Sequence, residues 1–405
     1  MRAESFDYVN EFSAISAANE LESIAKWWIE HSVDLDNGGF WGQIDNNAQP
    51  NRKANKGIVL NTRVLWFFSE LATSTNCESH QSVARRAYEY LLSYFLDTAS
   101  GGFYWSLDYK GQAVDTKKQV YAQCFAVYAL CSYYKLTGDE QAKTLAYSTF
   151  ELIEHNALDK EHGGYIEACS REWGAIDDYR LSVKDLNCPK SMNTHLHVLE
   201  AYTSLHQVSP NEITESALKH SLTVFLDKIV TDDGAHLRLF FDKQWRCLSH
   251  EVSFGHDIEA SWLICEAAEV LKDEKLTDKT TKIALTLANE CRENGMAANG
   301  YVLDEYNTQT KYVSDNSFWW VQAEALVGFY NAYQLTQDRK YLEAVDQIWQ
   351  FIQNEHKDCG EWLWLARSQG GERLNYKAGF WKGPYHNGRA MLEIVKRFKG
   401  ATSNA

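Results

Sequence analysis

Three histidines in this sequence stand among aromatic and hydrogen-bonding residues, a setting that suits proton transfer. His197, His256 and His386 lie in the segments Ser-Met-Asn-Thr-His-Leu-His, Gly-His-Asp-Ile-Glu-Ala-Ser-Trp and Trp-Lys-Gly-Pro-Tyr-His-Asn-Gly-Arg. An imidazole has an unperturbed pKa of about 6.5, so it accepts and donates protons near neutral pH. Neither a second acid pair nor a metal-ligand spacing accompanies these histidines, which indicates proton transfer at a carbon atom. If one pocket collects all three, the fold must bring distant segments together.

A glycine followed by an aromatic residue recurs along the chain and suggests a structural repeat. Clear copies are found at residues 38–40, 101–103 and 163–165, and weaker copies at 234, 300–301 and 360–362, in steps of 60 to 71 residues. This period is longer than that of the common solenoid repeats and suits two helices with a long connection. Six repeats therefore predict about twelve helices.

The pattern of apolar residues predicts the same number of helices. Apolar-rich segments that suit helices cover residues 15–31, 57–76, 79–96, 116–136, 139–156, 189–207, 211–229, 256–272, 277–293, 317–335, 338–354 and 385–398. The segment that begins at Gly57 is apolar nearly all round, as an inner helix would be, whereas residues 80–94 carry polar groups between their apolar positions. We therefore expect an all-α protein with two concentric rings of six helices, and long loops over a pocket at one end.

Length and composition indicate one large catalytic body. A chain of 405 residues would permit two or three domains, but the repeat runs throughout and no Pro/Ser-rich linker divides it. We therefore predict a single domain over residues 1–405. Nine scattered cysteines without a Cys-x-x-Cys spacing suit reduced thiols better than a disulfide framework or a metal site.

The charge of the chain bears on its partners. A net charge of −15 disfavours nucleic acid and anionic membranes, which require clustered Lys and Arg. No run of about 18 apolar residues is present to cross a bilayer, and the amino-terminal residues lack an apolar signal core. We expect a cytoplasmic protein, a monomer or weak homodimer, that acts on a small substrate that is neutral or weakly charged.

Aromatic residues suggest what that substrate is. The chain has 14 Trp and 22 Tyr, many of them in or near the glycine repeats. Sugar rings stack their C–H faces on such side chains while their hydroxyl groups bind polar partners. Most of these aromatic residues should belong to the core. Trp319 and Trp381, which lie near the histidine segments, are the exceptions that we expect in a pocket.

Six separated motifs, in order along nearly the whole chain, resemble the N-acylglucosamine 2-epimerase superfamily, and most of all its cellobiose 2-epimerase group. They are Lys56-Gly57 with residues 60–66, residues 181–185, residues 190–202, residues 254–262, residues 319–324 and residues 384–389. The resemblance implies an (α/α)6 barrel and inversion or isomerisation of a reducing-end sugar without a metal or other cofactor. One departure is the sequence Phe-Trp-Trp-Val at 318–321, where many relatives have a charged residue before the Trp pair and Pro after it.

The resemblance also assigns roles to individual residues. It implies that His256 and His386 exchange the roles of general base and general acid on opposite faces of a planar enediolate. It places His197 as a third pocket histidine that binds substrate oxygens or assists ring opening. The substrate-binding set is then Arg63, Asp185, Asn193, Glu259, Trp319 and Trp381, with Arg63 supplying a positive charge near the enediolate.

Helical spacing adds two local expectations. Glu259 follows His256 at i+3, so its carboxylate can orient the imidazole and favour the protonated form. His195 lies about 200° around a helix from His197, so only one of the two can face a pocket. The resemblance selects His197.

Other functions stay open at this point. Within the superfamily, a mannose 2-epimerase or an aldose–ketose isomerase shares the enediolate. A glycoside hydrolase would need two carboxylates flanking the bond, and no such pair stands out. A non-catalytic sugar-binding protein would not need all three histidines. A metal held by His195, His197 and Asp185 is disfavoured because a His-x-His pair diverges on a helix.

Overall fold

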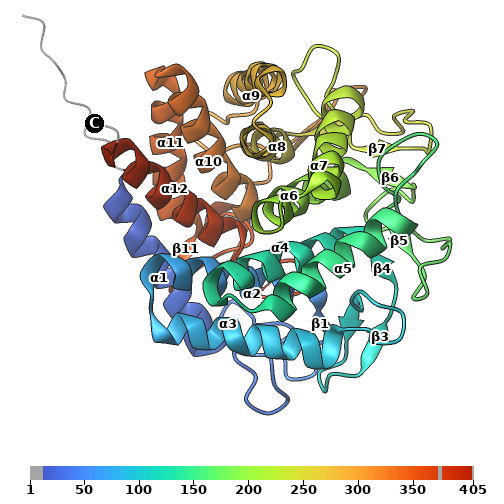
Figure 1. The fold of residues 1–405 in the computed structure, drawn as a ribbon. Helices are drawn as coiled ribbons and strands as arrows, with labels where there is room; N and C mark the ends of the chain where they lie inside the picture. Colours follow the sequence, from blue (N-terminus) through green and yellow to red (C-terminus); the bar gives the residue numbers. More distant parts are fainter. Residues whose placement is uncertain (1–11, 373–375, 404–405) are drawn as a thin grey trace, which may run out of the picture.

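Twelve α-helices form two concentric rings in the residues that the computed structural model describes, 12–372 and 376–403 (Figure 1). The inner helices are α2 (Ile58–Thr75), α4 (Val120–Thr137), α6 (Met192–Val208), α8 (Phe254–Leu271), α10 (Trp319–Thr336) and α12 (His386–Ser403). The outer helices are α1 (Ala14–His31), α3 (Glu78–Tyr90), α5 (Glu140–Asn156), α7 (Glu212–Val224), α9 (Glu274–Asn294) and α11 (Arg339–Phe351). Each inner helix packs on the next, and α12 closes the ring against α2. The predicted (α/α)6 barrel is confirmed.

Hydrophobicity decides which ring a helix joins. In the inner helix α4, the residues from Val120 to Val127 are all buried, so every face meets protein. In the outer helix α11, buried Tyr341, Val345 and Ile348 share one face, and the opposite face is polar. Three outer helices continue as single π-helical turns, η1 (Leu91–Phe95), η2 (Phe225–Ile229) and η3 (Ile352–His356), and a 3₁₀ turn, η4, spans Arg367–Gln369.

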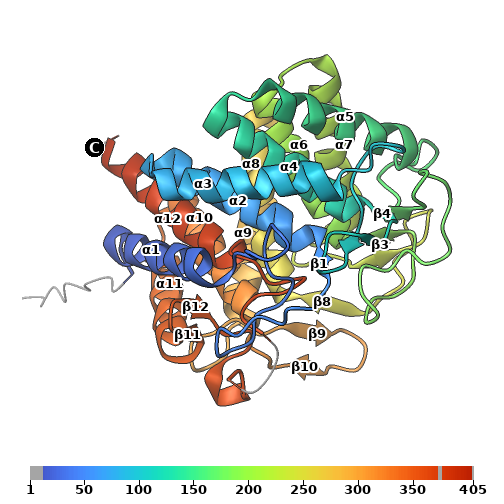
Figure 2. The same ribbon diagram turned by 90° about the horizontal axis from the view of Figure 1, so that it is seen from below.

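Twelve short strands gather at one end of the barrel (Figure 2). They are β1 (Lys56–Gly57), β2 (Ser106–Leu107), β3 (Ala113–Asp115), β4 (Lys118–Gln119), β5 (Ala168–Cys169), β6 (Lys190–Ser191), β7 (Phe240–Phe241), β8 (Glu251–Ser253), β9 (Glu305–Asn307), β10 (Val313–Ser314), β11 (Lys357–Asp358) and β12 (Glu361–Trp362). All pair antiparallel, as β1-β2-β3, β4-β5, β6-β7, β8-β9-β10 and β11-β12. Strands β1, β4, β6 and β8 lead directly into inner helices and pair with the long loop of the next repeat. The amino-terminal ends of the inner helices therefore meet these loops.

The glycine repeat is a tight turn that follows each outer helix. Gly101 and Gly102 adopt φ of +73° and +66°, a left-handed conformation that favours glycine. The turn pairs Leu96 with Phe103 across it, and Phe103 is fully buried. Equivalent pairs are Val33 with Phe40, Leu158 with Tyr165, Val230 with Leu237 and Met296 with Val302.

A polar residue near the start of an inner helix holds each of four turns. The backbone N–H of Phe103 donates to Gln123 Oε1 (2.9 Å), that of Leu237 to Asp257 Oδ1 (2.9 Å) and that of Val302 to Gln322 Oε1 (2.8 Å). In the third repeat the N–H of Tyr165 donates to His195 Nε2 (2.8 Å). His195 therefore satisfies a buried backbone donor, and does not face the pocket.

Buried ion pairs fasten four turns to the segments that lead into inner helices. The lysine Nζ atoms lie 2.7 to 3.0 Å from the carboxylates in the pairs Lys56–Asp34, Lys118–Asp97, Lys190–Asp159 and Lys382–Glu361. Each lysine is fully or almost fully buried. Removal of one partner would leave an uncompensated buried charge, so these pairs fix the positions at which the inner helices begin.

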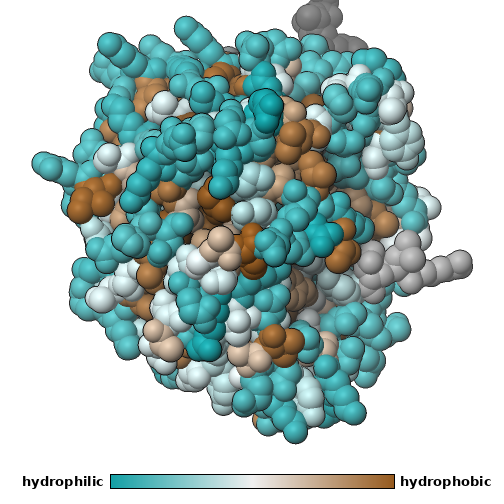
Figure 3. Space-filling model, turned by 90° about the vertical axis from the view of Figure 1, so that its right-hand side faces the viewer, coloured by the Kyte–Doolittle hydropathy of each residue, from teal (hydrophilic) through white to brown (hydrophobic). Residues whose placement is uncertain are grey.

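The outside of the molecule is largely polar. Figure 3 shows one side, where hydrophilic residues cover most of the surface and hydrophobic residues form small scattered patches. No helix in the described part of the chain is long and apolar enough to span a membrane.

Candidate active site

All nine predicted site residues line one cavity of about 480 Å³. They are Arg63, Asp185, Asn193, His197, Glu259, His256, Trp319, Trp381 and His386, and the wall also includes Tyr121, Asp304, Phe318, Trp320, Trp364 and residues 181–184. A smaller cavity of about 130 Å³ adjoins the first, because Leu181, Asp185, Asn193 and His256 line both. The volume lies within the range of small-molecule sites.

The cavity lies at the amino-terminal ends of the inner helices. His386 is the first residue of α12, His256 lies in the first turn of α8, and Arg63 and His197 lie in the second turns of α2 and α6. Unpaired N–H groups give a helix amino terminus a partial positive charge. Six such ends around one cavity favour a substrate on which negative charge develops.

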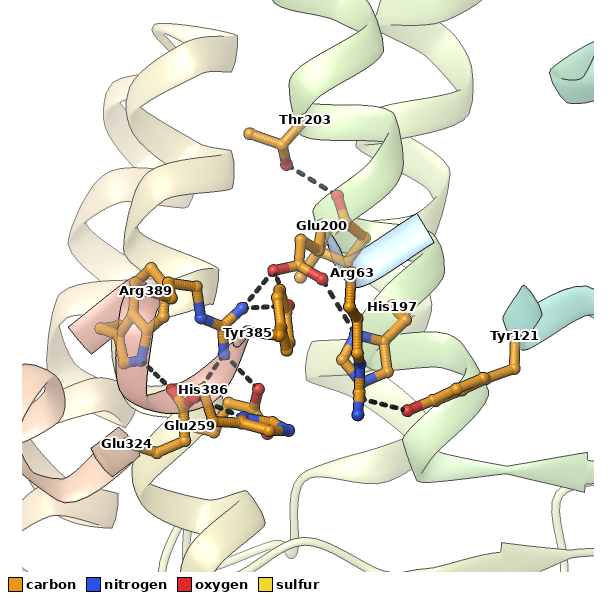
Figure 4. Close-up of polar contacts among 12 residues, drawn as sticks. Arg63, Tyr121, His197, Glu200, Thr203, Glu259, Glu324, Tyr385, His386 and Arg389 are labelled. Carbon is orange, nitrogen blue, oxygen red and sulfur yellow. Dashed lines mark hydrogen bonds and ion pairs between the residues drawn. The ribbon is translucent and has the colours of Figure 1, made fainter. Parts of the chain in front are cut away.

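The hydrogen bond of His386 leaves one ring nitrogen free to act as a base. Its Nδ1 lies 2.7 Å from Glu324 Oε1 (Figure 4). A carboxylate only accepts, so Nδ1 carries the proton and Nε2 keeps a free lone pair. Burial and the nearby charges of Arg63 and Arg389 hold the pKa of His386 well below its ordinary value. The lowered pKa favours the neutral imidazole.

His197 is positioned in the same way. Its Nδ1 lies 2.9 Å from Glu200 Oε2, so Nδ1–H donates and Nε2 is free. The ring packs between Tyr121 (ring centroids 4.8 Å apart) and Phe125 (4.7 Å). These contacts fix the imidazole, which is almost fully buried.

His256 has a different partner from the one predicted. Its Nδ1 lies 2.9 Å from Ser253 Oγ, the residue that caps α8, and Glu259 makes no hydrogen bond to it. The expectation that Glu259 orients His256 and favours its protonated form is wrong. Burial, with a smaller effect of His197, lowers the pKa of His256 to about 3. A hydroxyl partner stabilises an imidazolium less than a carboxylate does.

Arg389 is the partner that binds Glu259 instead. Its guanidinium donates to Glu259 Oε1 (2.5 Å) and Glu324 Oε1 (2.7 Å), and also to Glu200 and the hydroxyl of Tyr385 (Figure 4). Arg389 is 1% exposed, so three carboxylates and their cation are buried together. Two of these carboxylates, Glu200 and Glu324, hold His197 and His386. The guanidinium therefore supports both imidazoles indirectly.

Arg389, Glu200, Glu324 and Tyr385 are site residues that were not predicted from the sequence. All four lie within the motifs quoted above, and Glu200 and Glu324 are each the single acidic residue of an inner helix, α6 and α10. Charged residues in such helices are buried, and buried charges require partners. That signal was available in the sequence.

The guanidinium of Arg63 lines the cavity and bonds neutral groups. Its Nη1 donates to the carbonyl of Trp381 (2.5 Å) and its Nη2 to the hydroxyl of Tyr121 (2.9 Å). Within residues 12–372 and 376–403, no carboxylate lies within 4 Å of this guanidinium. The positive charge is therefore available to a negatively charged group in the cavity.

Aromatic side chains form the walls. The ring centroid of Trp320 lies 4.7 Å from that of His256 and 5.6 Å from that of His386, so this indole contacts both imidazoles. Trp319 packs on Trp364 with ring centroids 4.5 Å apart. Asp185 lies in the loop at the cavity mouth, where its Oδ2 accepts from the N–H of Ser182 (2.7 Å).

Two groups of residues have side chains of the types that bind metal ions. Glu259, Glu324 and His386 offer atoms within 4.8 Å of one another. However, Arg389 already donates to both carboxylates, so the guanidinium occupies the position of a cation. The set of His195, His197 and Asp185 is not brought together, because both ring nitrogens of His195 are bonded to backbone, Nδ1 to Ser191 O and Nε2 to Tyr165 N.

The role of His195 predicts how stability depends on pH. Burial lowers its pKa to about 4, whereas an unfolded histidine has a pKa of about 6.5. Below pH 6.5 His195 binds a proton in the unfolded chain but not in the folded protein. The contribution of neutral His195 to the free energy of unfolding is therefore lost as the pH falls. In His195→Gln, an amide oxygen can accept from Tyr165, as Gln123 and Gln322 do in their repeats. We expect the variant to match wild type within about 1 kcal/mol at pH 8 and to lose less stability at pH 5.

Urea unfolding of both proteins between pH 8 and pH 5 measures this difference. Burial raises the pKa of Glu167 and of Glu259 to about 7, which makes stability fall as the pH rises from about 4.5 to 7. Both proteins share that effect, so it cancels in the difference between them. A difference that does not change with pH would contradict the role given to His195.

Fold and cavity together define an (α/α)6-barrel protein whose pocket is lined by imidazoles. Residues 39–390 match the family described as N-acylglucosamine 2-epimerase. The chain is 42% identical over 375 residues to a cellobiose 2-epimerase of Bacteroides fragilis, covering 92% of this chain and 95% of that protein. It is 36% identical to one of Dictyoglomus turgidum, covering 98% of each. The chain belongs to the N-acylglucosamine 2-epimerase family.

Solved structures agree with this family. The cellobiose 2-epimerase of Bacillus thermoamylovorans superposes with a TM-score of 0.90 at 35% identity, over 95% of this chain and 99% of that one. An α-mannanase of glycoside hydrolase family 76 from Bacteroides thetaiotaomicron gives a TM-score of 0.65 at 10% identity, over 96% and 97% of the chains. The second likeness shows the fold alone.

Proposed function

We propose that this protein is a carbohydrate 2-epimerase that interconverts glucose and mannose at the reducing end of β-1,4-linked disaccharides. It would convert cellobiose to glucosyl-mannose and lactose to epilactose. The observation that carries this proposal is that His256 and His386 line one cavity and contact the same indole, that of Trp320. The names of the relatives from Bacteroides fragilis and Dictyoglomus turgidum support the choice of substrate.

The reaction begins with ring opening, which exposes an aldehyde next to carbon 2. His197, with a free Nε2 beside Tyr121 and Arg63, is placed to bind the sugar oxygens during this step. Tryptophans 319 and 381 offer flat surfaces for the sugar rings, and Asn193 and Asp185 offer polar contacts. The sugar would thus be held by its faces and by its hydroxyl groups.

Proton transfer then inverts carbon 2. Nε2 of His386 removes the proton, and the electron pair delocalises to give a cis-enediolate, whose negative charge Arg63 and the helix ends stabilise. His256, as the imidazolium, returns a proton to the opposite face. The negative enediolate favours this protonated form, because an opposite charge raises the pKa of an imidazole. The two histidines exchange roles in the reverse direction, and solvent restores their protons.

A glycoside hydrolase fits the cavity less well. It requires two free carboxyl groups on either side of a bond, but of the three that line the cavity Glu259 is bound to Arg389 and Asp185 to the backbone of Ser182, which leaves Asp304 alone. An isomerase or a mannose 2-epimerase would use the same enediolate on a monosaccharide.

We further propose a single domain over residues 1–405, no requirement for a cofactor, and a cytoplasmic monomer or weak homodimer.

Product analysis tests this function. Cellobiose, lactose, glucose and mannose are incubated separately with the enzyme and a chelator, without added cofactor, and the products are separated and identified. We expect glucosyl-mannose and epilactose from the disaccharides. Ketose as the main product would indicate an isomerase, and free glucose from cellobiose a hydrolase. Loss of activity with chelator that a single divalent ion restores would refute the mechanism that relies on imidazoles alone.

A further inference from the structure

One position recurs in five repeats and points to a further substrate contact. It lies two residues after the buried residue of the glycine turn, and its carbonyl accepts the N–H of the first residue of an inner helix. These bonds run from Ile58 to Trp105, from Val120 to Glu167, from Met192 to Leu239, from Phe254 to Asp304 and from Trp319 to Trp364, at 2.8 to 3.2 Å. The backbone bond places each of these residues at the pocket end of the barrel.

Side chains at this position line the two cavities. Trp364 and Asp304 line the larger cavity, and Glu167 and Leu239 line the smaller one. The fifth, Trp105, packs against Trp381 with ring centroids 5.7 Å apart. Four of the five loops therefore supply a wall residue at this position, and of the two that line the larger cavity Asp304 carries a carboxyl group.

The carboxyl group of Asp304 has unused hydrogen-bonding capacity. Its Oδ2 accepts from the hydroxyl of Ser314 (3.0 Å). No Lys or Arg of the described residues lies within 4 Å of it. Burial and the neighbouring carboxylate of Glu305 raise its pKa to about 7, while Lys184 across the mouth, with the side chains of Ser314 and Asn316, lowers it. A partly buried carboxyl group without a cation suits a ligand that brings hydroxyl donors.

Asp304 lies on the loop side of the cavity. Its side chain is half-buried and bonds Ser314 of β10, whereas Arg63, His197 and His386 are buried on inner helices. The carboxyl group therefore belongs to the outer part of the cavity, which the loop of residues 181–185 also lines.

We propose that Asp304 binds a hydroxyl group of the sugar unit that is not epimerised, and so selects disaccharides over monosaccharides. This proposal rests on the proposed function. The reducing sugar reaches the histidines in the depth of the cavity, and its neighbour then lies between Asp304 and the loop of residues 181–185. A hydrogen bond from a sugar hydroxyl to a carboxylate is stronger than one between neutral groups.

Kinetics of Asp304→Ala and Asp304→Asn on cellobiose and on mannose test the proposal. Loss of a hydrogen bond to a charged group typically costs about 1.5–3 kcal/mol, so Asp304→Ala should raise KM for cellobiose by about 10- to 100-fold with kcat nearly unchanged. Asp304→Asn keeps an acceptor and should fall between Asp304→Ala and wild type. Neither variant should change kcat/KM for mannose by more than about twofold. Asp232→Asn, at a fully exposed residue, is the control and should leave both sugars unaffected.

The pH dependence gives a second readout that a purely structural role would not change. As the pH rises from 6 to 8, Asp304 ionises and becomes the better acceptor, so wild-type KM for cellobiose should fall. This step should be absent in Asp304→Asn. An equal loss on both sugars, or none on either, would overturn the role of Asp304. If wild type turns over mannose and no disaccharide, the proposed function itself fails.

Discussion

Replacing His386 by alanine should lower the epimerisation of cellobiose by several orders of magnitude. Loss of a positioned acid or base typically costs about 10²- to 10⁴-fold, and this reaction needs both proton transfers. His256→Ala should have an effect of similar size. The free Nε2 of His386 and the bond from its Nδ1 to Glu324 are the structural reason. Initial rates of epimer formation measure the loss, with His195→Gln as the control because His195 binds the backbone of Tyr165.

Turnover in deuterium oxide distinguishes a mechanism with two bases from a mechanism with one. The proton that one histidine removes is not the proton that the other delivers, so wild-type epimer should carry solvent deuterium at carbon 2. Substrate recovered early should carry little. In His386→Ala, His256 can still remove and return a proton on its own face, which should label recovered glucosyl-mannose and leave recovered cellobiose unlabelled. An epimer free of deuterium, or near-wild-type epimerisation by either alanine variant, would reject the assignment of the two histidines.

Arg389→Leu should be among the most destabilising substitutions in this protein. The guanidinium neutralises Glu200, Glu259 and Glu324, which are 5%, 1% and 0% exposed. Removal of one partner of a buried ion pair typically costs about 3–5 kcal/mol, and here three carboxylates lose their cation. Arg389→Lys keeps the charge but not the planar fork, so it should recover part of the stability.

Urea unfolding and kcat measure this effect. Arg397→Leu is the matched control, because Arg397 lies two turns further along α12 and bonds Glu393, Asn331 and Gln334 at the partly exposed end of the barrel. We expect it to cost less than Arg389→Leu, because Arg397 has one carboxylate partner and both side chains of that pair reach solvent, at 14% and 16% exposure. Arg389→Leu should also lower kcat, since Glu200 and Glu324 lose the contact that fixes them beside His197 and His386. Equal stability of the two leucine variants would show that the buried cluster does not need its cation.

Much of the fold could be predicted because its signals are local. The twelve predicted segments correspond to the twelve helices, since each needs only a periodic apolar pattern and a cap. The segments that end at residues 96, 229 and 354 pass the ends of α3, α7 and α11 because π-helical turns continue them. The pairing of the two- and three-residue strands and the lysine–carboxylate pairs could not be predicted, since they join residues of different loops.

The cavity residues were predicted through six motifs, and their partners were not. The spacing of His256 and Glu259 permits a local contact, but Arg389, 130 residues along the chain from Glu259, binds that carboxylate instead. Spacing alone gives the groups that are near enough to interact. The stronger, charge-assisted bond from a distant helix decides which contact forms.

The contact of α1 with α12 joins the first helix of the barrel to its last. An open solenoid has terminal repeats that can fray while the rest stays folded, but a closed ring has none. The catalytic pocket spans this seam, because His386 is the first residue of α12 and Arg63 belongs to α2, the helix that α12 meets. During synthesis the base and its arginine would therefore come together only after the last helix has docked, so an incomplete chain would be inactive as well as unfinished.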